Sequence, residues 1–104
     1  MAVYSLSLNY ERVGKVFEAQ GKLPEALNVY EQSLKIRQHL AEYDPTNVGW
    51  YKDFSENYDR VGNVLLAQGK LQEALDIYQH ELTSAKNLVD LIRGPIISTN
   101  VFLK

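Results

Sequence analysis

Two Gly-Lys pairs, Gly21-Lys22 and Gly69-Lys70, are the first residues in the sequence whose spacing could support chemistry. A glycine followed by lysine occurs in the loop that cradles nucleotide phosphates. That loop follows a strand and requires an earlier glycine and a Ser or Thr after the lysine. Both pairs here lack these residues and follow segments with helical periodicity. We therefore interpret them as bends between helices with a solvated lysine.

The histidines and carboxylates do not form a recognisable catalytic or metal-binding pattern. His39 and His80 have no histidine or carboxylate at ligand spacing, so no metal site is predicted. General acid–base catalysis requires a pocket that perturbs a carboxyl group. The carboxylates of the first and third expected helices fit ordinary solvated helix faces better; they are Glu11, Glu18, Glu56 and Asp59. We predict no enzyme activity and no cofactor.

Composition excludes several further classes. The chain has 104 residues, a net charge of -2 and no cysteine, which excludes disulfides and thiolate metal sites. Nucleic-acid binding needs a concentrated positive surface, which the sequence lacks. No apolar run is long enough to span a bilayer, and the N-terminus has no basic segment before an apolar one. We expect a cytoplasmic protein that binds neither nucleic acid nor membrane.

The sequence repeats itself. Residues 19–27 recur with one substitution as residues 67–75, which is 48 positions later. Aligning 9–30 with 57–78 gives 15 identities in 22 positions. A repeat at this spacing indicates duplication of one structural unit.

Periodicity of apolar residues at three and four positions predicts four helices, over 3–20, 24–43, 48–68 and 71–93. Gly21 and Gly69 are expected to end the first and third helices, Thr46 or Asn47 to cap the third, and Gly94-Pro95 to stop the fourth. The tail, residues 95–104, has no helical period. We expect it to be loose or to lie against an exposed apolar face.

Gly14 and Gly62 lie at matching places inside the first and third helices, where glycine costs about 1 kcal/mol relative to alanine. Because the same cost occurs in both units, we predict that another helix passes so close to each of these glycines that a Cβ would not fit. In an antiparallel pair, Ala26 is the small residue expected opposite Gly14.

Each unit also carries a family pattern: an aromatic, an apolar–Gly pair and an aromatic or leucine in one helix, then an early alanine and an aromatic in the next. The residues are Tyr10, Val13-Gly14, Phe17, Ala26 and Tyr30, then Tyr58, Val61-Gly62, Leu65, Ala74 and Tyr78. This pattern resembles the tetratricopeptide repeat. The 48-residue period resembles the long-helix variants of kinesin light chain and several bacterial arrays. Pro45 comes later than the usual closing proline, and Ser33 and Glu81 occupy positions where small residues are usual.

The resemblance implies an all-α fold of two antiparallel helical hairpins stacked as a short right-handed solenoid. We expect a repeat domain at 1–94, with repeat one at 3–45 and repeat two at 46–94, followed by the 95–104 tail. The chain looks like an excerpt of a longer array, or an array shortened at both ends. Two units leave apolar faces uncovered, and self-association would cover them.

In this family the first helices of successive units line a concave groove that holds a peptide. The resemblance implies five peptide-binding residues here: Arg12, Lys15, Asp59, Arg60 and Asn63. Acidic Glu11 and Asp59 replace the clamp lysines of chaperone-binding members. The alternative for all these positions is an ordinary wet surface with intrahelical pairs such as Glu11–Lys15.

The sequence leaves three hypotheses for the function. The favoured one is a protein-interaction module that binds a peptide or a partner helix in the concave groove. The second is structural, a unit that forms homo-oligomers through its end helices and the tail. The third is an enzyme or a nucleic-acid-binding protein. The net negative charge disfavours nucleic-acid binding, and the lack of a catalytic residue pattern disfavours an enzyme.

Overall fold

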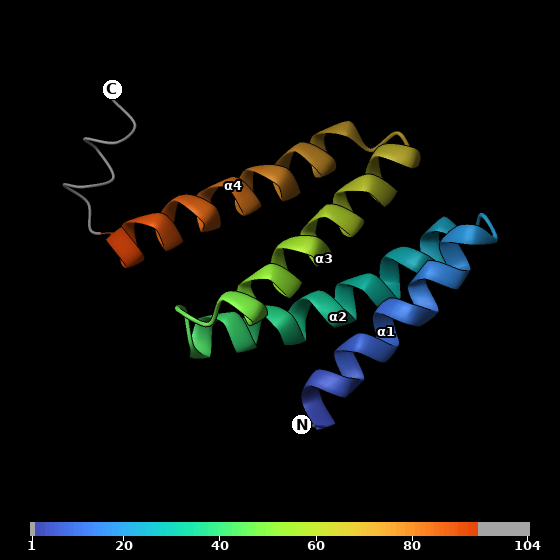
Figure 1. Cartoon of the computed structure of the whole chain (residues 1–104). Helices are drawn as coiled ribbons and strands as arrows, with labels where there is room; N and C mark the ends of the chain where they lie inside the picture. Colours follow the sequence, from blue (N-terminus) through green and yellow to red (C-terminus); the bar gives the residue numbers. More distant parts are fainter. Residues whose placement is uncertain (1, 94–104) are drawn as a thin grey trace.

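A computed structural model describes residues 2–93 as four helices that zigzag through the molecule. They are α1 (Ala2–Ala19), α2 (Leu23–Tyr43), α3 (Val48–Ala67) and α4 (Leu71–Arg93). Successive helices pack against each other, with α1 and α4 at opposite ends of the row (Figure 1). The predicted all-α fold of two helical hairpins is confirmed. The expectations for Gly94-Pro95 and for the 95–104 tail lie outside the described residues.

The two hairpin turns are built alike. Gly21 and Gly69 have φ of 75° and 76°, a left-handed conformation that suits glycine. After α1 the Lys22 amide donates to the Phe17 carbonyl at 2.8 Å, and after α3 the Lys70 amide donates to the Leu65 carbonyl at 2.9 Å. These bonds satisfy carbonyls at the helix ends, as the two glycine-lysine sequences predict.

Asn47, in the connection between the two hairpins, caps the N-terminus of α3. Its side chain accepts a hydrogen bond from the Trp50 amide at 3.1 Å, which satisfies one free amide at the start of α3. The α2 helix ends at Tyr43, just before Asp44-Pro45. The residue before a proline is disfavoured in the helical conformation, which explains this end.

The two mid-helix glycines are crowded by tyrosine rings. A Cβ at Gly14 would overlap the ring of Tyr30, and a Cβ at Gly62 would overlap the ring of Tyr78. The prediction of a close approach is confirmed, and the atoms nearest to an added Cβ belong to the tyrosine ring in each hairpin. The duplication therefore preserves a glycine–tyrosine pair in each hairpin, where the flat ring fills the space that a Cβ would take.

The apolar core is centred on α2 and α3, which are covered on both sides. Its fully enclosed members are Ala26, Tyr30, Val61, Val64, Leu65 and Ala74. Along Leu71–Arg93, only Ala74 is buried. The Cα atoms span 47 × 35 × 15 Å, so the helices form a thin row, and within residues 2–93 each of the two end helices has one side that no other helix covers.

Candidate protein-binding surface

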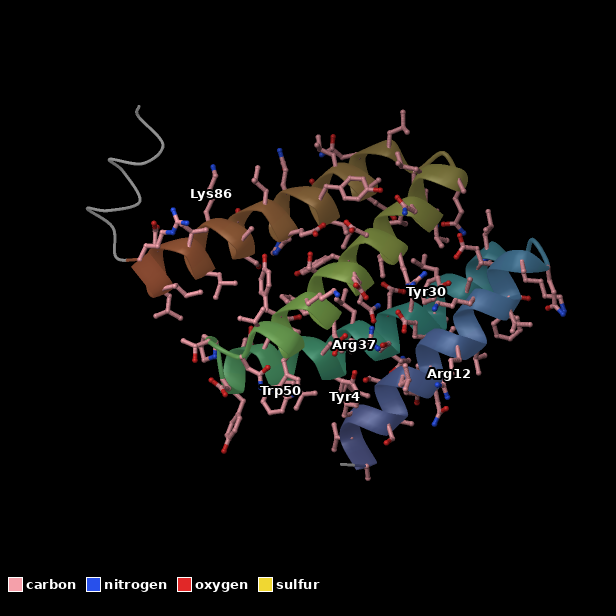
Figure 2. All side chains as sticks on the ribbon, viewed as in Figure 1. Tyr4, Arg12, Tyr30, Arg37, Trp50 and Lys86 are labelled. Carbon is pink, nitrogen blue, oxygen red and sulfur yellow. The ribbon has the colours of Figure 1, made fainter. Side chains whose placement is uncertain are left out.

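A buried ionic cluster joins α1, α2 and α3. Arg37, whose side chain is 2% exposed, donates from Nη1 and Nη2 to the two carboxylate oxygens of Glu11, both at 3.3 Å. Arg60 donates from Nε to the same carboxylate at 2.7 Å. Figure 2 shows Arg37 at the centre of the molecule. We call this group, with the polar residues that complete it, the Glu11 cluster: Ser7, Glu11, Ser33, Arg37, Asn57 and Arg60.

Neutral polar groups complete the cluster. Asn57 accepts from Arg37 Nη1 at 3.0 Å and donates to the Tyr30 carbonyl at 2.9 Å. The Ser33 hydroxyl lies 2.7 Å from Asn57 Oδ1 and 2.9 Å from the Ser7 carbonyl. All three neutral side chains of the cluster are fully buried. Because buried polar groups are costly unless they are hydrogen bonded, this bonding is what permits the cluster inside the fold.

The surroundings of Glu11 favour its ionised form. Burial alone would raise the pKa of this carboxyl group, but the hydrogen bonds and charges of Arg37 and Arg60 outweigh burial and lower it. Glu11 was expected on a solvated helix face, paired with Lys15. It is instead buried and paired with two arginines from other helices. Glu11 is buried because Arg37 of α2 and Arg60 of α3 both pack against its carboxylate.

The second hairpin has a different arrangement at the corresponding place. Ser55, the counterpart of Ser7, donates to the Glu81 carboxylate at 2.5 Å. Glu81 replaces Ser33 and Ala85 replaces Arg37, so the second unit has an added acid and no arginine. Burial raises the pKa of Glu81, the Ser55 hydrogen bond opposes that shift, and neighbouring Asp59 raises the pKa further. This site is therefore acidic and short of a cation.

The five residues predicted for peptide binding divide into two groups. Arg12, Lys15, Asp59 and Asn63 are exposed, on α1 and α3. Arg12 projects from α1 on the side away from α3 (Figure 2). Asn63 accepts a hydrogen bond from the Tyr78 hydroxyl at 2.6 Å. The Arg60 side chain is 31% exposed and pairs with Glu11, so it holds α3 against α1.

A hollow of about 380 Å³ opens between the start of α1 and the start of α3. It is lined by Tyr4, Asn47, Gly49, Trp50 and Asp53. Figure 2 shows Tyr4 and Trp50 lying near each other at this end of the molecule. The hydrogen bond to the Asp53 carboxylate raises the pKa of the Tyr4 hydroxyl, and burial and the charge of Asp53 raise it further. The hollow thus combines two aromatic surfaces with a hydrogen-bond acceptor.

A second hollow, of about 470 Å³, lies where the later half of α4 diverges from α2 and α3. Phe54 and Tyr58 contribute two rings in tilted contact, with centroids 4.7 Å apart and an interplanar angle of 56°. Leu88 and Leu91 of α4 face them across the hollow. Because three helices contribute to it, its size depends on how far α4 is splayed from the rest.

Sequence reasoning did not identify Arg37, Asn57 or Ser33 as partners in one cluster. A signal for Arg37 was present. It stands between Leu34 and Leu40 on the apolar side of α2, and its counterpart is Ala85. An arginine in an apolar stripe, unmatched in the second unit, indicates a buried charge pair that the second unit lacks.

Within residues 2–93, no three His, Cys, Asp or Glu side chains are grouped so as to hold a metal ion. None of the helices over this range combines the length and apolar character needed to cross a bilayer.

Comparison with known proteins gave matches to family models. Residues 10–45 match one tetratricopeptide repeat model and residues 58–90 match another. The two matches begin 48 residues apart, at the spacing of the internal duplication. Searches of curated proteins and of solved structures gave no match.

Proposed function

The chain belongs to the tetratricopeptide repeat family, and we propose that it is a non-catalytic module that binds a segment of a partner protein along α1 and α3. Repeats of this family generally act as protein-interaction modules. The finer proposal is that the partner is an extended peptide or a helix, held across the first helices of both units.

The observation that carries the proposal is the hollow between α1 and α3. Its volume of about 380 Å³ is large enough for a side chain of a partner. Tyr4 and Trp50 are aromatic residues of the kind that dominate binding energy when a partner covers them. The Asp53 carboxylate beside them accepts hydrogen bonds from a peptide amide or a basic side chain.

Polar side chains extend this surface along both helices. Lys15 on α1 and Asn63 on α3 are exposed and offer donors to peptide carbonyls. Asp59 adds a charged acceptor on α3, Arg12 adds a charged donor at the far edge of α1, and Arg60 supports the surface by holding Glu11. A cytoplasmic location and the absence of nucleic-acid and membrane binding remain predictions.

The test is selection of peptides from a random displayed library on the immobilised chain, followed by fluorescence titration with a selected peptide. Trp50 is the only tryptophan of the chain, so a ligand in the hollow changes the emission of a single known residue. We expect this change, and we expect the double variant Lys15→Ala, Asn63→Ala to weaken binding by about tenfold.

The matched control is Lys35→Ala with Asn28→Ala, which removes the same side-chain types from exposed positions of α2. This variant should bind as the unchanged chain does. The proposal is wrong if selected peptides bind without altering Trp50 emission and without sensitivity to Lys15 and Asn63.

A further inference from the structure

The side of α3 that packs on α2 has a counterpart on α1 that is uncovered within residues 2–93. Val61 and Val64 of α3 belong to the enclosed core, and Val64 is 0% exposed. Their counterparts 48 positions earlier, Val13 and Val16, are exposed, the latter to 57%. The same residue types thus lie at the same helical positions, buried in one helix and open in the other.

The side of α2 that packs toward α3 has an uncovered counterpart on α4. Leu27 and Leu34 of α2 are partly buried against the core. Leu75 and Leu82 occupy the corresponding positions of α4 and are exposed. The chain therefore carries both halves of its own α2–α3 interface a second time, one half at each end of the row (Figure 1).

The charges repeat as well. Within the chain, Arg60 of α3 donates to Glu11 of α1 at 2.7 Å. The corresponding residues are Arg12, a cation on the end helix α1, and Asp59, an acid on α3 next to the other end helix, α4. Both are exposed, and Arg12 points away from α3 (Figure 2).

We propose that the chain binds a second copy of itself head to tail. In this contact, α1 of one copy packs on α4 and α3 of the other copy, in the same way that α3 packs on α2 and α1 within one chain. Arg12 of one copy pairs with Asp59 of the other and supplies the cation that the acidic site beside Glu81 lacks. Asn9 donates to the Tyr78 carbonyl, as Asn57 donates to the Tyr30 carbonyl within the chain. Valine and leucine side chains exposed at both ends become covered.

This contact joins two different surfaces, so it is heterologous. Each added copy leaves one free α1 and one free α4, which permits further addition unless the rotation closes a ring. A mass that keeps rising with concentration is expected, rather than a stop at the dimer.

Charge reversal at the two ends tests the contact by sedimentation velocity over a wide concentration range. Arg12→Glu reverses a charge only on the α1 surface of the contact, and Asp59→Arg reverses one only on the surface formed by α3 and α4. Either variant alone should associate at least tenfold more weakly than the unchanged chain. An equimolar mixture should recover association, because the intact α4 end of one variant fits the intact α1 end of the other. The double variant Arg12→Glu, Asp59→Arg should also recover it.

The controls reverse charges of the same sign away from the proposed contact. Lys15→Glu on α1 and Glu31→Lys on α2 are exposed in the structure and should leave the mass unchanged. Lys15→Glu also separates the two proposals, since it should weaken peptide binding only. A single-chain mass at every concentration overturns the inference. So does association that is indifferent to both reversals, or that the mixture and the double variant fail to restore.

Discussion

The two hairpins start from nearly the same residues and place them in different surroundings. In the first, the acid on the inner side of α1 is Glu11, enclosed by two arginines and covered by α3. In the second, its counterpart Asp59 is exposed and lies near another acid, Glu81, with Ala85 where the first unit has Arg37. The comparison shows that a duplicated acidic position takes its role from the next helix in the row, which is present for one unit and absent for the other within residues 2–93.

The largest expected difference between the hairpins is the response to losing this acid. Glu11→Ala leaves Arg37 buried with its charge unpaired, and loss of one partner from a buried pair costs about 3–5 kcal/mol. Asp59→Ala, at the matching exposed site, should change the free energy of unfolding by at most about 0.5 kcal/mol. Urea unfolding followed by circular dichroism measures both, at a concentration where the mass is that of one chain.

If Glu11→Ala does not fold, the double variant Glu11→Leu, Arg37→Met provides a second measurement. It removes both charges and should unfold at higher urea than Glu11→Ala, because no unpaired charge is left inside. Equal losses from Glu11→Ala and Asp59→Ala would contradict the difference drawn between the hairpins.

The glycine–tyrosine pairs should also respond unequally. Gly14→Ala forces a methyl group against the ring of fully buried Tyr30, at an overpacking cost of about 1–3 kcal/mol that exceeds the roughly 1 kcal/mol gained in helix propensity. Gly62→Ala meets Tyr78, which is only partly buried and has room to move. We expect a lower melting temperature for Gly14→Ala and a nearly unchanged one for Gly62→Ala. A larger loss at Gly62 would show that Tyr78 is the more tightly held ring.

The two units should have opposite dependence on pH. The pKa of Glu11 is lowered in the folded state, so its contribution is present above the pKa of the unfolded chain and is lost as the pH falls through the folded value. The pKa of Glu81 is raised, so the unfolded state ionises first and the fold loses stability as the pH rises through this range. Glu81→Gln should therefore stabilise the protein at pH 7, by about 0.5 kcal/mol, as for other partly exposed charge pairs.

This gain should shrink as the pH falls below the ordinary range of a glutamate, where Glu81 is protonated in both states. Denaturant titrations of the unchanged chain and of Glu81→Gln at pH 3 and pH 7 measure the difference. A gain of equal size at both pH values would assign the effect to something other than ionisation of Glu81.

The smallest expected effect comes from giving the second unit the arginine of the first. Ala85→Arg introduces a cation on α4 at the position that Arg37 occupies on α2. With α4 open to solvent, the gain should be about 0.5 kcal/mol or less. Carbon-detected NMR titration of Glu81 should show its pKa falling toward the ordinary value. An unchanged pKa would mean that the added arginine does not reach the acidic site.

Local features were predictable from sequence because each depends on a few neighbouring residues. The helices follow from the spacing of apolar residues and the turns from Gly21 and Gly69. The crowding at Gly14 and Gly62 follows from the presence of a destabilising glycine at the same helical position in both units. The partners of Glu11 were not predictable in this way. Lys15, four residues along, is the local choice, whereas Arg37 lies 26 positions away and reaches Glu11 only after α2 and α3 have packed.

The same limit applied to the predicted binding residues. Arg60 was grouped with Arg12 because the two occupy matching positions of α1 and α3. Packing separates them, since Arg60 meets Glu11 and Arg12 has no helix beside it within residues 2–93. Position in a repeat fixes the direction of a side chain, but the neighbour in that direction is a property of the whole row.

The Glu11 cluster has a consequence for how the molecule opens. Because it bonds α1, α2 and α3 to one another, none of these helices separates without exposing an ionic group of the cluster. Backbone amides of the three helices should therefore exchange hydrogen with solvent in a single slow event. Those of α4, which buries Ala74 alone, should exchange sooner through detachment of that helix. The unit that unfolds cooperatively thus comprises three helices and cuts across the two-hairpin repeat.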